Sequence, residues 1–409
     1  MRYCRFRLLT LSFLLATASA LPAAGATETL IYSFANAALG EPHGRLHFVG
    51  SSLFGTASGG DDGKGQVFEL TNSGGSWSEA TILAFDGADG EYPAAGLIDS
   101  SGTFLFGTTP QGDTNGWGNA FILSNLGGSW TSATIWAFGG VAADGRLPGS
   151  DLIMDSSGDL YGTTFQGGAS DYGTVFQLTE NFSTWSETVL YSFKGGSDGD
   201  SPNSGVVMDA SGALYGVAPY GGRCTYCGVA YELSQSGGVW KEKILHKFAA
   251  GTDGSDPFGP IVEDSSGNFY GTTYYGGNTS CQSPTGCGTV FELYISSGVW
   301  KKKALYKFPG GSNGMNPAAG LATDASGSLY GTTVFGGGTG CGGNGCGTVF
   351  KLSLSSGKWK ETVLHRFSDS GGDGTEPVAA VILDASGSLY GTTQSGGADG
   401  NGAVYEVTP

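Results

Sequence analysis

Short runs of apolar and β-branched residues alternate with clusters of Gly, Ser, Asn and Asp along almost the whole chain. One unit contains four such runs, SDLIMD (150–155), LYGTT (160–164), GTVFQL (173–178) and WSETVLYSF (185–193). Runs of this length and composition, bounded by turn residues, predict β-strands. No stretch of the mature chain combines sustained helical periodicity with caps. The pattern therefore predicts an all-β chain.

The four-run unit recurs seven times. Its marker is an aromatic residue followed by Gly and, in all copies but the fourth, Thr, and these markers begin 52 to 60 residues apart at Phe54, Phe106, Tyr161, Tyr215, Tyr270, Tyr330 and Tyr390. A period near 55 residues suits one four-stranded sheet per repeat. The 75 glycines recur at fixed offsets between aromatic strands, which is not the pattern of a disordered linker.

The two ends of the repeat array predict how it closes. The last copy reaches only its third strand, at 402–407, whereas the segment Glu28 to Phe34 has the pattern of a fourth strand and precedes the first complete unit. Pairing this segment with the last sheet leaves no bare edge. We therefore expect a seven-bladed β-propeller of four-stranded blades over residues 27–409, closed by the N-terminal strand. An open solenoid is the alternative, since repeat arrays need not close.

The repeats also resemble a known family. The segments LYGTTVFGG (329–337), GTVFKL (347–352) and DASGSLYGTT (384–393) are similar to the bacterial GloVer tandem repeat of "choice-of-anchor" proteins. The resemblance extends over about residues 28 to 409. It implies an exported or surface-attached protein with no established activity or catalytic residues. Many relatives end in an anchoring segment, whereas this chain ends on its last predicted strand, so we do not expect an anchor here.

The N-terminus independently predicts export. Three arginines precede an apolar run from Leu8 to Ala16, and A-x-A patterns end at Ala20 and Ala26. This is the layout of a secretory signal peptide, and the run is too short for a comfortable membrane span. We expect a signal peptide over residues 1–26, with cleavage after Ala26 or alternatively Ala20. The mature chain should then be secreted, extracellular or periplasmic, without a membrane span.

Six cysteines of the mature chain form three close pairs between the second and third strands of consecutive units. The pairs are Cys224 with Cys227, Cys281 with Cys287, and Cys341 with Cys346. An oxidising compartment favours three local disulfides. Zinc is the alternative interpretation, but only the first pair has the Cys-x-x-Cys spacing and no His lies nearby.

Charge limits the partners of the chain. Its 36 Asp and Glu against 19 Lys and Arg give a formal net charge of −17, and such a surface repels nucleic acid. Six of the connections between units carry an Asp-Gly-x-x-Pro motif, with Asn313 in place of Asp in one of them, which predicts a turn capped by Asp. Calcium is the alternative, with Asp198, Asp200, Asp253 and Asp256 as candidate ligands. We expect a monomer without a cofactor.

A propeller binds ligands where its repeat is broken, because one ligand needs an asymmetric site on a symmetric scaffold. The loops between second and third strands vary most, and they share one rim with the connections between units. The candidate ligand-binding residues there are Trp117, Arg146, Tyr172, Tyr220, Arg223, Tyr226, Tyr274, Tyr275 and Phe335. Aromatic faces beside polar donors commonly hold sugars and extended polypeptides. We therefore expect a non-catalytic scaffold that binds carbohydrate or a surface protein; alternatively, these rings only cover the blade tops.

An enzyme is the competing class. Only three groups break the repeat in a way that suits acid–base chemistry: His43 and Arg45 in the first connection, and Glu263 on an innermost strand. A lyase or hydrolase at the propeller centre would require these groups to reach one substrate.

Overall fold

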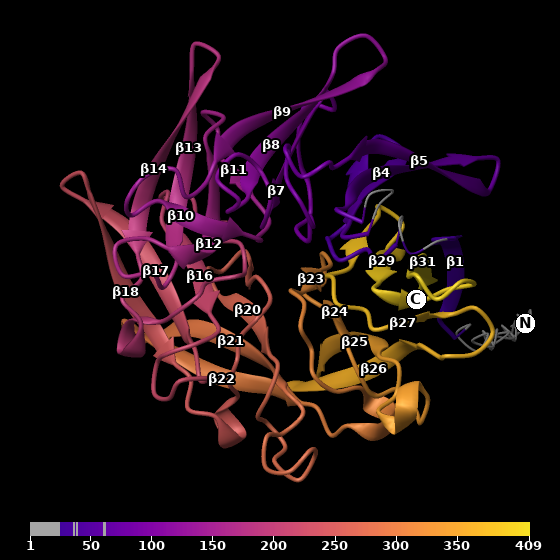
Figure 1. Cartoon of the computed structure of the whole chain (residues 1–409). Coiled ribbons are helices and arrows are strands. Elements are labelled where there is room, and N and C mark those ends of the chain that lie inside the picture. Colours follow the sequence, from indigo (N-terminus) through magenta and orange to yellow (C-terminus); the bar gives the residue numbers. More distant parts are fainter. Residues whose placement is uncertain (1–24, 36, 38–39, 60–62) are drawn as a thin grey trace, which may run out of the picture.

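Seven β-sheets surround a central axis in the computed structural model, which describes residues 25–35, 37, 40–59 and 63–409 (Figure 1). The predicted seven-bladed propeller is confirmed. Each blade is a meander of antiparallel strands in which sequence neighbours pair, except that the N-terminal strand of the chain supplies the fourth strand of the last blade. The first strand of a blade lies nearest the axis and the fourth on the outside (Figure 1). The expected signal peptide lies outside the described residues except for its last two positions.

The strands recur in the same order in every blade. Blade 1 comprises β2 (His47–Val49), β3 (Ser52–Ala57), β4 (Gln66–Ser73) and β5 (Ser76–Ala84). Blade 2 comprises β6 (Ile98–Ser100), β7 (Phe104–Thr109), β8 (Asn119–Asn125) and β9 (Trp130–Ala137). Blade 3 comprises β11 (Ile153–Met154), β12 (Leu160–Gly167), β13 (Thr174–Asn181) and β14 (Thr184–Ser192), with β10 (Gly145–Pro148) also pairing with β12. Blade 4 comprises β15 (Val207–Met208), β16 (Leu214–Ala218), β17 (Val229–Ser236) and β18 (Val239–Lys247).

The remaining blades repeat the arrangement. Blade 5 comprises β19 (Val262–Glu263), β20 (Phe269–Thr273), β21 (Thr289–Ser296) and β22 (Val299–Lys307). Blade 6 comprises β23 (Ala322–Thr323), β24 (Leu329–Thr333), β25 (Thr348–Ser355) and β26 (Lys358–Arg366). Blade 7 comprises β28 (Ile382–Leu383), β29 (Leu389–Thr393), β31 (Ala403–Thr408) and β1 (Thr27–Ser33). β27 (Gly374–Thr375) and β30 (Ser395–Gly396) form a separate two-stranded sheet.

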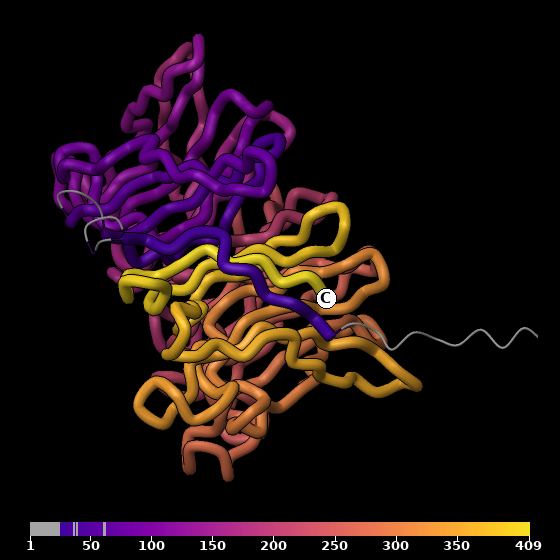
Figure 2. Tube along the Cα trace, turned by 90° about the vertical axis from the view of Figure 1, so that its right-hand side faces the viewer, coloured from indigo at the N-terminus to yellow at the C-terminus, as the bar shows by residue number. Residues whose placement is uncertain are grey.

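The N-terminal strand closes the ring as predicted. β1 pairs antiparallel with β31 from Thr27 opposite Thr408 to Ser33 opposite Ala403. Figure 2 shows the indigo N-terminal segment running along the yellow C-terminal strands. Phe34, which follows β1, is fully buried, and its ring centroid lies 5.2 Å from that of Phe68 in blade 1. The first and last parts of the chain therefore share one blade and one inter-blade core.

The first strands are shorter than the sequence pattern predicts. In blade 3 the expected run over 150–155 is a strand only at Ile153 and Met154. The residues before it do not pair along a strand ladder; instead the Ser150 carbonyl accepts a hydrogen bond of 3.2 Å from the hydroxyl of Thr108 in blade 2. A side chain of the neighbouring blade thus takes the place of a strand partner.

Each residue of the aromatic-Gly-Thr marker has a separate structural role. The Tyr hydroxyl donates to the Asp of the hairpin between the first two strands, as from Tyr161 to Asp155 at 3.0 Å. The Gly leaves room for the third-strand ring, because a Cβ on Gly331 would lie 2.8 Å from Cζ of Phe350. The Thr of the marker joins its blade to the next one. In five blades its hydroxyl donates a hydrogen bond to a backbone carbonyl of the connection that leads into the next blade, at Ala95, Ser150, Ser204, Ala319 or Ala379.

The three predicted disulfides form, with Cα–Cα distances of 5.1, 5.7 and 5.3 Å. The tryptophans that open fourth strands pack across blades, as Trp130 does against Phe54 with ring centroids 5.5 Å apart. Within the part of the chain that the structure describes, no helix is long and apolar enough to span a bilayer. The three disulfides are compatible with an extracellular protein.

Changing Tyr231 to Phe should raise the free energy of unfolding by about 1 kcal/mol, because an unmade hydrogen bond of a buried hydroxyl is unfavourable. The hydroxyl of Tyr231 is buried and has no hydrogen-bond partner among the described residues. Blades 3 and 5 have Phe176 and Phe291 at the same position. Denaturant unfolding measures the change. The matched control is Tyr161→Phe, which removes a made bond and should lower the stability; an equal loss in both variants would contradict the prediction.

Candidate functional site

A cup opens at the centre of the face that carries the connections between blades. Each connection contains a proline, at 42, 93, 148, 202, 257, 317 or 377, and the residue before it has a φ between 55° and 60° in all seven copies. The backbone turns sharply there, and residues that follow the proline line the cup. The cavity has a volume of about 290 Å³, at the lower end for a small-molecule site.

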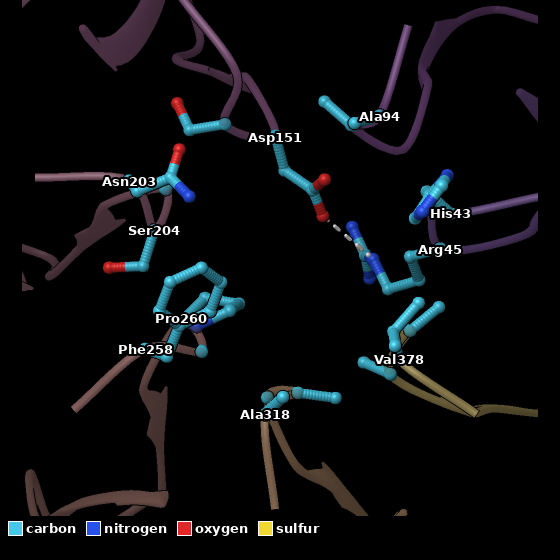
Figure 3. A pocket seen from close by; sticks show the side chains of 18 of the residues that line it. His43, Arg45, Ala94, Asp151, Asn203, Ser204, Phe258, Pro260, Ala318 and Val378 are labelled. Carbon is cyan, nitrogen blue, oxygen red and sulfur yellow. Dashed lines mark hydrogen bonds and ion pairs between the residues drawn. The ribbon is translucent and has the colours of Figure 1, made fainter. Parts of the chain in front are cut away.

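The lining of the cup is polar on one side and apolar on the other (Figure 3). Blades 1, 3 and 4 contribute the polar side chains His43, Arg45, Asp151 and Asn203. Blades 5, 6 and 7 contribute Phe258, Pro260, Ala318 and Val378. Seven equivalent positions therefore carry different chemistry, so that the cup is asymmetric on a symmetric scaffold.

An ion pair joins blades 1 and 3 across the mouth of the cup. Nε of Arg45 lies 3.1 Å from Oδ2 of Asp151, and Oδ1 of the same carboxylate accepts the Gly96 N–H at 2.6 Å. The Arg45 side chain is 43% exposed and makes no other hydrogen bond to the residues that the structure describes. Asp151 thus orients the guanidinium and leaves its remaining N–H groups available to a ligand.

His43 lies beside this pair and differs from it in burial. Burial lowers the pKa of His43, against the opposite effect of the Glu41 backbone and the Gln394 side chain, so the imidazole is neutral at pH 7. Its Nδ1 atom is buried and forms no hydrogen bond to any described residue. Glu263 is not among the residues that line the cup; burial and the carboxylates of Asp209 and Asp264 raise its pKa in β19.

Two predicted rim residues, Trp117 and Arg146, contact each other between blades 2 and 3. Cζ of Arg146 lies 4.6 Å from the Trp117 ring centroid, and the guanidinium also pairs with Asp171. A cavity of about 220 Å³ lies beside them. The indole is 37% exposed. The cation–π contact and the ion pair hold both side chains in place and leave one edge of the Trp accessible.

Tyr172 and Arg223 line a larger rim cavity, of about 380 Å³, between blades 3 and 4. Tyr226 is 69% exposed, and its ring lies 5.8 Å from that of Tyr220, centroid to centroid. These four predicted residues form an accessible aromatic and cationic surface that continues outward from the polar side of the cup.

The other predicted rim residues are less accessible. The rings of Tyr274 and Tyr275 contact each other edge to face, with centroids 4.7 Å apart, and both are half-buried. Phe335 packs against a buried cluster that includes Phe308 and Met315. Phe335 therefore contributes to the core between blades 5 and 6.

The four candidate calcium ligands have different surroundings. Asp198 accepts hydrogen bonds from the Tyr191 hydroxyl at 2.9 Å and the Lys194 N–H at 2.8 Å. Asp253 lies 3.1 Å from Nζ of Lys302. Burial raises the pKa of Asp256 to about 6. Within the described ranges these carboxylates do not gather in a group of three close ligand atoms.

The chain belongs to the Gloeobacter/Verrucomicrobia repeat family, whose model matches residues 15–222, 134–343 and 278–409. No curated protein sequence matches the chain. The polysaccharide lyase Uly1 is similar in structure at 12% sequence identity, with a TM-score of 0.50 over 96% of this chain and 94% of that one. A PL25 ulvan lyase bound to a GlcA(1-4)Rha3S saccharide is similar at 10% identity, with a TM-score of 0.51 over 91% and 94% of the two chains. A Lactobacillus plantarum protein is similar at 13% identity, with a TM-score of 0.51 over 83% and 86%. These likenesses show the fold alone.

Sequence reasoning identified His43 and Arg45 but missed Asp151, Asn203 and Phe258. The proline of each connection is the signal that could have found them. His43, Asn203 and Phe258 are the first residues after their prolines, and Arg45 and Asp151 are the third. When the seven connections are aligned on this proline, the positions after it are those that line the cup, and the Asp-Gly turn lies before it.

Proposed function

We propose that this protein is a non-catalytic propeller that binds carbohydrate, with one sugar residue in the central cup and the adjoining part of the ligand on the rim of blades 2 to 4. The observation that carries the proposal is the divided lining of the cup. A pyranose has hydroxyl groups around its edge and an apolar C–H face. Arg45, Asp151 and Asn203 supply donors and acceptors for the hydroxyls, and the Phe258 ring offers a surface for the C–H face.

The size of the cup supports a single sugar residue rather than a longer segment. Its 290 Å³ is smaller than the rim cavity beside Tyr172 and Arg223, at about 380 Å³. The connection that carries Asp200 in that rim cavity leads directly to Asn203 in the cup. A polymer end held in the cup would therefore extend over Tyr172 and Tyr226.

Changing Phe258 to Ala should weaken glycan binding about tenfold, which corresponds to about 1.4 kcal/mol of lost stacking. The measurement is a screen of the mature chain against neutral and uronate-containing polysaccharides, followed by calorimetric titration of the best ligand. Asn203→Ala should also weaken binding, because one pair of hydrogen-bonding atoms is lost. Phe182→Ala is the control, since Phe182 is fully exposed in the β13–β14 hairpin on the opposite rim.

Three results would change the assignment. If Trp117→Ala weakens binding and Phe258→Ala does not, the ligand lies on the rim alone. Binding to cell surfaces that is lost after protease treatment of those surfaces would favour a protein partner. No binding to any glycan, or equal affinities in every variant, would contradict the proposal.

A lyase or hydrolase is the second candidate, because His43 and Arg45 both line the cup and His43 is neutral at pH 7. A neutral imidazole can accept a proton from a bound sugar, and the guanidinium can stabilise negative charge that develops nearby. The same polysaccharide screen tests this candidate. Shortening of a bound polymer that stops in His43→Asn would favour the enzyme over the binding module.

A further inference from the structure

A polar junction recurs between the outer strands of neighbouring blades. It contains an aromatic or imidazole side chain near the end of one fourth strand and the Asp or Asn of the connection that follows. The third member is the second residue after the Trp position of the next fourth strand. Between blades 3 and 4 the Tyr191 hydroxyl lies 2.9 Å from Oδ1 of Asp198 and 3.3 Å from Oε2 of Glu242. Between blades 5 and 6 the corresponding residues are Tyr306, Asn313 and Glu361.

Two of these junctions contain a histidine, and they differ in one residue. Between blades 4 and 5, Nε2 of His246 lies 3.0 Å from Asp253, and Nζ of Lys302 lies 3.1 Å from the other oxygen of that carboxylate. The Lys302 side chain is only 3% exposed, so the junction contains its own buried cation. Between blades 6 and 7 the same places are taken by His365, Asp373 and Glu28.

The second histidine junction has an excess of negative charge instead. One ligand atom from each of Glu28, His365 and Asp373 lies within 4.8 Å of the others. His365 and Asp373 both act electrostatically on Glu28, in opposite directions. Oε1 of Glu28 is buried and forms no hydrogen bond to any described residue. Two carboxylates and an imidazole therefore converge where the junction between blades 4 and 5 has an ammonium group.

We propose that the Glu28, His365 and Asp373 junction binds a Zn²⁺ ion. Zinc takes one imidazole nitrogen and carboxylate oxygens at about 2.0 Å, which places neighbouring ligand atoms about 3.3 Å apart in a tetrahedral site. Nε2 of His365 and Oδ2 of Asp373 are 3.2 Å apart. Both side chains are partly exposed, at 18% and 16%, so that water can supply a fourth ligand.

Backbone groups hold the Asp373 carboxylate in this position. Its Oδ2 accepts the Ser368 N–H at 3.0 Å and its Oδ1 accepts the Gly374 N–H at 2.8 Å. Such hydrogen bonds orient a ligating carboxylate before the metal arrives. Three disulfides occupy the six cysteines of residues 27–409, so no thiolate there competes for the ion.

The position of the site gives the ion a structural role. Glu28 lies on β1, the strand that closes the ring, whereas His365 lies on β26 and Asp373 in the connection that follows it. An ion bound to all three side chains ties the N-terminal strand to blade 6. Because only the folded ring brings the ligands together, zinc should stabilise the closed propeller.

Zinc titration of the full mature chain by calorimetry tests the proposal, with Co²⁺ absorption as a readout of the ligands. We expect one ion per chain and a melting temperature that rises by a few degrees when zinc is in hundredfold excess over its dissociation constant. Glu28→Lys and His365→Tyr should each weaken binding at least tenfold. Both substitutions place at this junction a residue that an equivalent junction elsewhere in the ring already has, Lys302 or Tyr191, so we expect both variants to fold.

His246→Tyr is the matched control, because it alters the junction that contains Lys302 and should leave zinc affinity unchanged. Absence of micromolar zinc binding in the unaltered chain would overturn the proposal. So would unchanged affinity in His365→Tyr, since the ion would then bind elsewhere, for example at His43 or His47. Glycan binding in the central cup is independent of this site, and its loss or retention has no bearing on the result.

Discussion

A chain that begins at residue 35 should fail to form a stable propeller, whereas one that begins at residue 25 should fold normally. Removal of β1 leaves the β31 edge unpaired along its whole length and takes Phe34 out of the core between blades 7 and 1. A bare edge strand readily pairs with another molecule. We therefore expect the shorter chain to aggregate or to lose cooperative thermal unfolding, as measured by light scattering and calorimetry.

A smaller change tests the same closure. Phe34→Ala in the full-length chain should lower the free energy of unfolding by about 3–5 kcal/mol, the usual effect of removing a buried phenyl ring. Leu30→Ala in the same strand is the control, because Leu30 is 38% exposed. If the chain that lacks β1 is monomeric and melts at the normal temperature, the ring does not depend on its N-terminal strand.

Raising the pH from 6.5 to 8.5 should destabilise the protein by about 2 kcal/mol through two partly buried glutamates. Burial raises the pKa of Glu187 to about 8, and Asp144 acts in the same direction. Burial and Asp198 likewise raise the pKa of Glu242 to about 8. Each folded-state pKa is above the unfolded value, so this contribution to stability is complete below pH 4.5 and is lost as the pH rises through 8. Partial solvent exposure reduces the full effect of such shifts.

The chosen range separates these glutamates from other groups. Asp256, with a pKa of about 6, has largely ionised by pH 6.5. The pKa of His43 is lowered from the ordinary histidine value, so its titration lies below this pH range. The double variant Glu187→Gln, Glu242→Gln should therefore unfold with a nearly flat pH dependence between 6.5 and 8.5. Denaturant unfolding at several pH values gives the slope. An equal slope in the unaltered and the double-variant protein would contradict the assignment.

Most of the fold could be predicted from the sequence because the repeat is local. Each marker predicts a strand, and seven copies of one unit with a displaced fourth strand predict a closed ring. The shortness of the first strands was not predicted, because a residue expected in such a strand, Ser150, instead bonds to a side chain of the neighbouring blade, Thr108. That contact joins residues 42 positions apart, so a local sequence pattern cannot predict it.

The candidate site was less predictable than the fold. His43 and Arg45 stood out because they break the repeat, but Asp151 and Phe258 looked like ordinary turn residues. Asp151 and Phe258 line the cup because their connections lie close to the propeller axis. The seven connections meet around that axis only after the ring has closed. Phe335, one of the candidate rim residues, packs against the core between blades, because its place beside Met315 is set by pairing with the preceding connection.

The number of blades, the closing strand and the three disulfides follow from the amino-acid sequence, because each depends on patterns within one unit or at the chain ends. Tertiary structure alone decided which residues share the central cup and which meet at the blade junctions. Glu28 and His365 are separated by most of the chain, and they become neighbours only because β1 completes the last blade beside β26. Both arrangements depend on ring closure, because it brings positions that are far apart along the chain next to each other around the axis and between blades.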